Sequence, residues 1–208
     1  MSLNVIAITQ RLINNDSYPE LREALSLEWG TFFLKNLPNC IPLPVSYSIP
    51  FSRYTDYLSS NLKGVILSGG NDLNFINPNP LSSLRDQYEL NLIDACIAQN
   101  IPLLGICRGS QIIASRFKAK IIKVEKHVGN QEIFDKQGNS YIVNSFHNYA
   151  IKDLDDDFEI IAKAFDNTIE AFAHRKYPLI GIVFHIERNN SESFTEPFLM
   201  WEKMVKGL

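Results

Sequence analysis

Short apolar runs that alternate with longer mixed stretches constrain the fold of this chain most strongly. Four such runs are too short for buried helices: residues 5–9, which are mostly β-branched, and residues 64–67, 102–106 and 180–184. They predict buried strands. Because helical patterns follow several of them, we predict an α/β fold in which residues 1–208 form a single domain. Its central sheet is expected to be mostly parallel and flanked by helices.

Helical spacing of apolar residues appears in four places: residues 17–36, residues 83–99, the segment directly after Cys107, and the tail at 193–205. The tail is a candidate dimer element, although a helix that packs on its own sheet is favoured. Residues 120–146 and 160–173 read instead as strands joined by turns.

Composition excludes several classes of protein. A net charge of −3 is too mild to predict a nucleic-acid partner or an anionic membrane surface. No apolar run is long enough for a membrane span, and the first residues do not resemble a signal peptide. Three cysteines without paired spacing fit a reducing compartment, so a cytoplasmic location is expected. No Cys/His cluster with metal-like spacing occurs, so neither a metal nor a cofactor is predicted.

One segment has the pattern of a nucleophile turn. Residues 105–109 read G-x-C-x-G between a predicted strand and a predicted helix, with Cys107 where hydrolases of another family carry serine. The two glycines leave room for a sharp turn that strains the backbone of the nucleophile. At a helix N-terminus the thiolate form is favoured, and the N–H of Arg108 points to where an oxyanion would form. Cys40 and Cys96 lack this context and are interpreted as packing residues.

A base and its orienting group follow the last predicted strand. A thiol needs a base that accepts and later returns its proton, and the imidazole of His185 suits this role. In extended chain, residues i and i+2 point the same way, so the Glu187 carboxylate can hold the His185 ring. Of the other histidines, His127 receives no role and His174, followed by two basic residues, reads as a solvated turn.

Four motifs occur in one order along the chain: Ser68-Gly69-Gly70, Gly105-x-Cys107-x-Gly109-x-Gln111, Val143-Asn144-Ser145-x-His147, and His185-x-Glu187. Together they resemble the class I (triad) glutamine amidotransferases. The likeness is greatest to their stand-alone branch, the C26 peptidases or γ-glutamyl-γ-aminobutyrate hydrolases. It covers most of the chain.

This resemblance implies a flavodoxin-like fold with a mixed sheet and a γ-glutamyl thioester intermediate. It implies Cys107 as nucleophile, His185 as base and Glu187 as its orienting residue. The backbone N–H groups of Gly70 and Arg108 would form the oxyanion hole. The residues implied to bind the glutamyl half are Gly69, Gln111, Ser145, Phe146, His147, Asn148 and Tyr149, with Gln111 at the α-amino or α-carboxylate end.

Departures from the family pattern bear on the leaving group. Ile186 stands where proline is usual, and Asn148-Tyr149 replaces a common His-Gln pair. These changes put a γ-aminobutyrate leaving group in doubt. The chain also resembles small amidotransferase-like proteins of capsule-modification pathways, which release a nucleotide (CDP) phosphoramidate from its γ-glutamyl conjugate.

Three hypotheses follow from the sequence. The first is a cysteine-dependent hydrolase that acts alone on a small γ-glutamyl amide and needs no synthase partner. The second is a glutaminase subunit that supplies ammonia to a separate synthase, since this chain has no room for a synthase domain. The third is a non-catalytic module that binds a glutamyl ligand, against which the intact triad argues.

Overall fold

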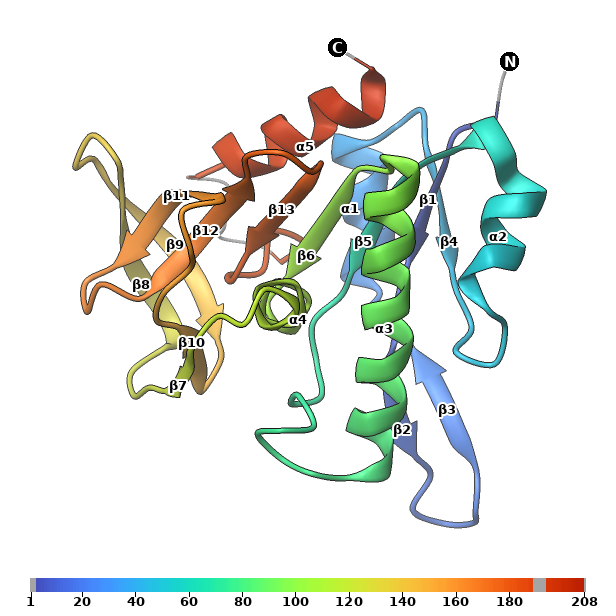
Figure 1. Ribbon diagram of the computed structural model, residues 1–208. Coiled ribbons are helices and arrows are strands. Elements are labelled where there is room, and N and C mark those ends of the chain that lie inside the picture. Colours follow the sequence, from blue (N-terminus) through green and yellow to red (C-terminus); the bar gives the residue numbers. More distant parts are fainter. Residues whose placement is uncertain (1–2, 189–193, 208) are drawn as a thin grey trace.

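One large sheet forms the centre of the protein in the computed structural model, which describes residues 3–188 and 194–207 (Figure 1). The described residues form an 11-stranded sheet with the order β4-β1-β5-β6-β13-β12-β11-β8-β9, to which β10 and β7 are joined through β12. The five strands from β4 to β13 are parallel, and the pairings beyond β13 are antiparallel. The predicted α/β fold with a parallel centre is therefore confirmed. The strands are β1 Val5–Ile8, β4 Ile41–Pro44, β5 Leu62–Leu67, β6 Leu103–Ile106, β7 Ile121–Lys123, β8 Val128–Asp135, β9 Ser140–Phe146, β10 Tyr149–Ile151, β11 Phe158–Ala164, β12 Ile169–His174 and β13 Leu179–Ile182.

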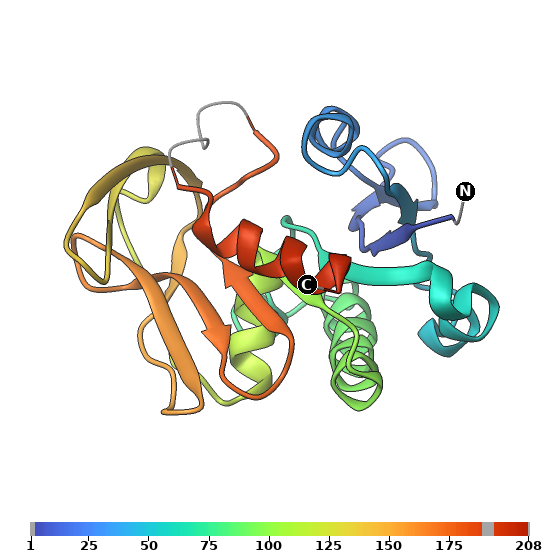
Figure 2. The same ribbon diagram turned by 90° about the horizontal axis from the view of Figure 1, so that it is seen from above.

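Helices cover both faces of the parallel half (Figure 2). On one face lie α1 (Glu28–Asn36) and α5 (Glu196–Lys206), and on the other lie α2 (Phe51–Leu58), α3 (Pro80–Gln99) and α4 (Arg108–Arg116). Because neighbouring strand residues point to opposite faces, Ile6 joins the first core and Ala7 the second. None of the helices in the described part combines the length and apolarity needed to cross a bilayer.

The last helix packs on its own sheet, as the sequence favoured. Trp201 and Phe198 of α5 are buried in the core of the first face. A Cβ on Gly64 would lie 3.0 Å from the Trp201 ring, so the glycine in β5 lets this helix approach the sheet closely. Ser193, at the start of the predicted helix, lies outside the described residues.

The helix predicted over residues 17–36 is wrong in its first half. A separate hairpin of β2 (Arg11–Asn14) and β3 (Leu21–Ala24) precedes α1, which begins only at Glu28. The side chain of Asn71 fixes this hairpin, because it accepts from the Leu12 N–H and donates to the Leu12 carbonyl, both at 3.0 Å. The contact between Asn71 and Leu12, which resembles the hydrogen bonding between two strands, thus overrides the helical spacing. Pro19, in the turn between β2 and β3, also has no backbone N–H to donate within a helix.

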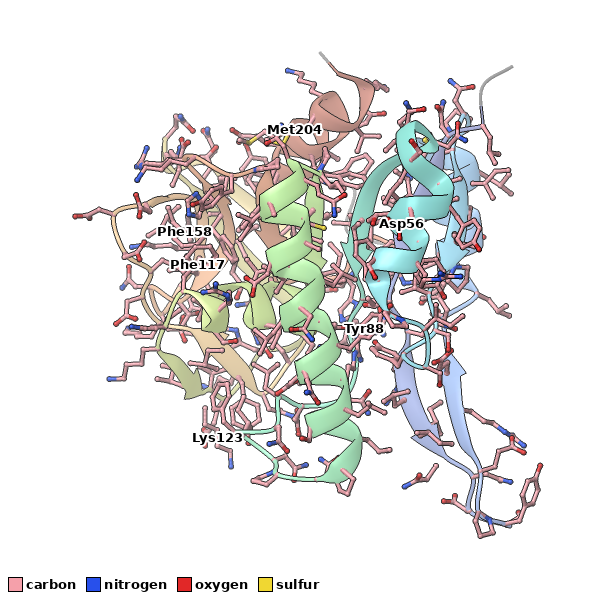
Figure 3. All side chains as sticks on the ribbon, turned by 45° about the vertical axis from the view of Figure 1, so that its right-hand side comes forward. Asp56, Tyr88, Phe117, Lys123, Phe158 and Met204 are labelled. Carbon is pink, nitrogen blue, oxygen red and sulfur yellow. The ribbon has the colours of Figure 1, made fainter. Side chains whose placement is uncertain are left out.

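His174 is buried and not part of a solvated turn, so that prediction is also wrong. It ends β12 and its Nδ1 accepts from the backbone N–H groups of Lys176 and Tyr177. Its ring packs against those of Phe117 and Phe158, whose own centroids lie 5.0 Å apart (Figure 3). The sequence pattern missed it because the aromatic partners come from distant elements.

Candidate active site

The turn between β6 and α4 holds Cys107 in a strained backbone conformation. Its φ is 53° and its ψ is −109°, a region that non-glycine residues rarely adopt. The flanking glycines have no room for a side chain. A Cβ on Gly109 would lie 2.0 Å from the Leu67 carbonyl oxygen, and one on Gly105 would lie 2.4 Å from the Gly109 carbonyl oxygen. The strand-to-helix turn predicted from the sequence is therefore present, with Cys107 at its tip.

Cys107, His185 and Glu187 lie together although 78 residues separate the first two. His185 Nδ1 is 2.6 Å from a Glu187 carboxylate oxygen. Cys107 and His185 both lie next to Gly69. A Cβ on Gly69 would lie 2.9 Å from the His185 ring and 3.4 Å from Cys107 Cβ. The side chain of Asn144 fixes the His185 backbone by accepting from its N–H and donating to its carbonyl, both at 2.9 Å.

The electrostatics of this group favour a charged imidazole. Burial lowers the pKa of His185, but the hydrogen bonds and negative charges of Cys107 and Glu187 raise it by more, to about 10. The structure thus favours an imidazolium at His185, between the Cys107 sulfur and the Glu187 carboxylate. Negative charge from Cys107 is one of the causes of the raised pKa, so loss of that charge makes His185 a better proton donor.

A fully buried arginine holds the loop that carries Gly69 and Gly70. The Arg85 guanidinium donates to the carbonyl oxygens of Ser68 at 2.7 Å, Gly69 at 3.1 Å and Gly70 at 2.6 Å. Its Nε donates to the Glu89 carboxylate at 2.9 Å. Through these three carbonyls Arg85 fixes the backbone of the loop that carries the predicted oxyanion donor Gly70.

The same buried carboxylate also holds the other predicted oxyanion residue. The Arg108 guanidinium forms ion pairs with Glu89 and with Asp86 of α3. Burial raises the pKa of the Glu89 carboxyl, but the charges of Arg108 and Arg85 hold it below its ordinary value. Gly70 and Arg108 are therefore both anchored to one ionic cluster, formed by Arg85, Asp86, Glu89 and Arg108, beneath the nucleophile.

Most residues predicted for the glutamyl half lie on α4 and on the segment from β9 to β10, and this group is called the glutamyl wall. The Gln111 side chain donates to the Tyr149 carbonyl at 2.8 Å, and His147 Nδ1 donates to the same oxygen at 3.0 Å. The Ser145 hydroxyl is used within the protein, because it donates to the His127 carbonyl. The Phe146 ring lies 5.9 Å from that of His185. The fourth residue of this segment, Asn148, is exposed.

A chain of buried ionisable groups supports that wall. His127 Nε2 donates to Asp166 at 3.1 Å, and Glu170 lies 3.5 Å from His127 Nδ1 and 3.6 Å from His147 Nε2. Burial raises the pKa of Glu170, yet the two histidines hold it below its ordinary value. Burial likewise lowers the pKa of His127, and its carboxylate partners raise it overall. These groups form an ionic network within the fold.

Three members of this chain, His127, His147 and Glu170, have ligand atoms within 4.8 Å of one another and could hold a metal ion. A protein donor already occupies part of this space. The Gln131 amide nitrogen lies 2.8 Å from His127 Nδ1 and 3.2 Å from the Glu170 carboxylate. The absence of a metal therefore stays a prediction from the sequence.

Sequence reasoning missed most of these supporting charges. Arg85 and Glu89 are spaced i, i+4 on a predicted helix, which signals an ion pair but does not reveal its burial. Glu170 is a carboxylate inside an otherwise apolar strand, and this signals a paired buried charge. His127 received no role because its carboxylate partners, Asp166 and Glu170, lie 39 residues or more along the chain.

Comparisons with known proteins bear on what such a site does. The sequence profile of the family described as "Glutamine amidotransferase class-I" matches residues 41–200. The chain is 49% identical to the Gamma-glutamyl-CDP-amidate hydrolase of Campylobacter jejuni subsp. jejuni serotype O:2 over 97% of this chain and 98% of that protein. It is 27% identical to a glutamine-hydrolyzing GMP synthase subunit of Methanococcus aeolicus over 89% and 91% of the two chains. A crystal structure described as that of a putative GMP synthase subunit from Thermoplasma acidophilum shares the fold, with a TM-score of 0.74, 20% identity, and coverage of 99% and 95%.

Proposed function

The chain belongs to the class I glutamine amidotransferase family, and on that premise we propose that it is a cysteine-dependent hydrolase of γ-glutamyl CDP amidate. The reaction releases glutamate and the nucleotide phosphoramidate. The observation that carries this substrate is the 49% identity to the Campylobacter hydrolase along nearly the whole of both chains. The site supports the chemistry, because it brings together a cysteine, a histidine and a glutamate in hydrogen-bonding order.

The first step is attack of the Cys107 thiolate on the γ-carbonyl carbon. The carbonyl oxygen becomes an oxyanion, which the backbone N–H groups of Gly70 and Arg108 receive. Preorganised donors of this kind stabilise the transition state most when they cannot move. Arg85 and Glu89 fix both donors from beneath, so the hole is held in place before substrate arrives.

The second step expels the leaving amine. When the thiolate becomes a thioether sulfur, His185 loses one of the negative charges that raise its pKa. The imidazolium then protonates the leaving nitrogen, while Glu187 keeps the ring oriented. Water, deprotonated by the now neutral His185, hydrolyses the γ-glutamyl thioester and regenerates the thiolate. Gln111 and the Ser145–Tyr149 segment bind the glutamyl half throughout.

Glutaminase activity in support of a separate synthase is the competing function, since the Methanococcus relative belongs to a glutamine-hydrolyzing synthase. The two functions differ in the preferred leaving group. A stand-alone hydrolase needs no partner chain and should act on the phosphoramidate much faster than on glutamine.

Purified protein therefore distinguishes them. We expect glutamate release from γ-glutamyl CDP amidate by the wild-type chain, with a kcat/KM well above that for glutamine. Cys107→Ala should lower this activity by on the order of 10³-fold or more. Cys40→Ala, a half-buried cysteine outside the site, is the matched control and should keep full activity. The proposal would be refuted if the purified chain hydrolysed glutamine efficiently but not γ-glutamyl CDP amidate, or if Cys107→Ala still turned over γ-glutamyl CDP amidate.

Location and assembly complete the proposal. The three cysteines are free, which fits the reducing cytoplasm. The substrate is a small molecule, and the mild net charge supports no nucleic-acid partner. The α5 helix packs in the core of its own chain through Phe198, Trp201 and Val205, while Leu199 on the same helix is exposed, so a homodimer remains open.

A further inference from the structure

An exposed arginine lies against the oxyanion loop. Arg11 is the first residue of β2, and a Cβ on Gly70 would lie 3.2 Å from both its Cβ and its Nε. The arginine side chain therefore runs across the face of Gly70. Among the described residues, its guanidinium has no hydrogen-bond or ion-pair partner. An unpaired cation next to a reaction centre is available to a ligand.

Arg11 forms one wall of a small pocket beside the triad. The pocket has a volume of about 90 Å³, and its lining includes Arg11, Ser26, Gly70, His185, Glu187 and Arg188. None of the glutamyl-wall residues Gln111, His147 and Tyr149 lines it. Gly69, which the sequence assigns to the glutamyl half, does line it, so the pocket adjoins the glutamyl half on the His185 side.

A second arginine, Arg188, lines the same pocket. Its guanidinium lies 4.5 Å from the centroid of the Phe146 ring, and its Nε is 3.5 Å from a Glu28 carboxylate oxygen. Glu187 also lines the pocket, and one of its carboxylate oxygens accepts from His185 Nδ1. The unpaired positive charge beside the triad is therefore that of Arg11.

The chemistry of the leaving group places an anion in the same position. His185 protonates the leaving nitrogen, so this nitrogen must lie next to the His185 ring and within reach of the pocket. In a γ-glutamyl nucleotide amidate, that nitrogen carries a phosphoryl group directly. Guanidinium groups bind phosphoryl oxygens through paired, charge-assisted hydrogen bonds.

We propose that Arg11, together with Arg188, binds the phosphoryl group attached to the leaving nitrogen and so selects phosphorylated leaving groups. This inference rests on the proposed function and deepens it. The hairpin that replaces part of the predicted helix positions this arginine. Its hydrogen bonds to the Asn71 side chain place Arg11 beside Gly70. The glutamyl wall recognises one half of the substrate, and the Arg11 pocket recognises the other.

The test compares two substrates that share the glutamyl half. Arg11→Gln should lower kcat/KM for γ-glutamyl CDP amidate by about 10–100-fold, the loss of one charge-assisted pair of hydrogen bonds. The same variant should hydrolyse γ-glutamyl p-nitroanilide, whose leaving group is neutral, within about twofold of wild type. Arg11→Lys keeps the charge and should recover part of the loss. Arg22→Gln, on the same hairpin but paired with Glu20, is the matched control and should change neither activity.

The outcomes separate this inference from the proposed function. Equal losses on both substrates would show that Arg11 supports the loop and not the leaving group, and no loss on either would leave it without a role. Both results overturn the inference. A wild-type protein that hydrolyses the anilide but not the phosphoramidate would refute the proposed function instead. In that case Arg11→Gln should still weaken binding of inorganic pyrophosphate, and unchanged binding would overturn the inference as well.

Discussion

The charged residues beneath Cys107 are paired within the protein, whereas the arginine in front of it, Arg11, is not. Beneath it, Arg85, Glu89 and Arg108 are buried, and they are paired with one another and with backbone carbonyls. In front of it, Arg11 is exposed and has no partner among the described residues. The buried charges have their partners inside the fold, so they shape backbone. The exposed charge of Arg11 has no partner among the described residues, and it can therefore recognise a ligand.

This difference predicts different consequences of mutation. Removing one member of a buried ion pair leaves an uncompensated charge and costs several kcal/mol, whereas a surface pair contributes about 0–1 kcal/mol. Variants of the buried cluster should therefore be less stable, and they should be less active on every substrate. Variants of Arg11 should lose neither stability nor activity on neutral leaving groups.

The largest effect is expected from Arg85→Met. Methionine fills the space of the arginine stem but donates to none of the carbonyls of Ser68, Gly69 and Gly70. We expect a loss of about 3–5 kcal/mol in the free energy of unfolding, measured by urea titration. The loosened oxyanion loop should also lower kcat on the order of 10²-fold for phosphoramidate and anilide alike.

A surface arginine gives the control for this experiment. Arg116 pairs with Asp94 on the outside of α4 and α3, with the two side chains about half exposed. Arg116→Met should change the free energy of unfolding by less than about 1 kcal/mol and leave kcat unaltered. If Arg85→Met were as mild as Arg116→Met, the buried cluster would not hold the loop.

The contrast between local and distant partners also explains how much the sequence could predict. The nucleophile turn is local, because Gly105, Cys107 and Gly109 restrict each other's backbone within five residues. Strand and helix patterns near it were predictable for the same reason. The support beneath it depends on an ion pair between Glu89 and Arg108, 19 residues apart on different helices. No local pattern encodes such a contact.

The hairpin and the antiparallel half of the sheet illustrate the same limit. Residues 120–146 and 160–173 were predicted as strands, but their pairing order depends on contacts between elements far apart in sequence. The helix predicted over residues 17–36 failed because Asn71, outside that window, holds Leu12 in a hairpin. The positions of Arg11 and of the pocket beside it could therefore not be read from periodicity.

A smaller effect is expected from Glu170→Gln in the glutamyl wall. The amide keeps the shape of the carboxylate but removes the charge that His127 and His147 share. We expect a loss of about 1–3 kcal/mol in the free energy of unfolding. Because His147 and Gln111 bond the same Tyr149 carbonyl, KM should rise for both the phosphoramidate and the anilide.

Here the substrates again separate the two regions. Arg11→Gln should affect only the phosphorylated substrate, whereas Glu170→Gln should affect both, since they share the glutamyl half. The matched control is Glu159→Gln, which changes a half-buried residue of β11 paired with Lys136 and should alter neither stability nor KM. A KM change confined to the phosphoramidate would contradict the assignment of this wall to the glutamyl half.

The smallest effect concerns His174, which is buried without a carboxylate in hydrogen-bonding contact. Burial lowers its pKa; the more distant charges of Asp157 and Asp155 raise it only in part, and Lys176 lowers it further. The unfolded chain has the ordinary value of about 6.5, so below this pH the unfolded state binds the additional proton. Stability contributed by His174 is therefore full above about pH 6.5 and is lost as the pH falls toward the folded-state pKa. His174→Asn, whose carbonyl can accept from the same two backbone N–H groups, should reduce the stability lost between pH 7.5 and 5.5 in urea titrations. An unchanged pH dependence would mean that protonation of His174 is not coupled to unfolding.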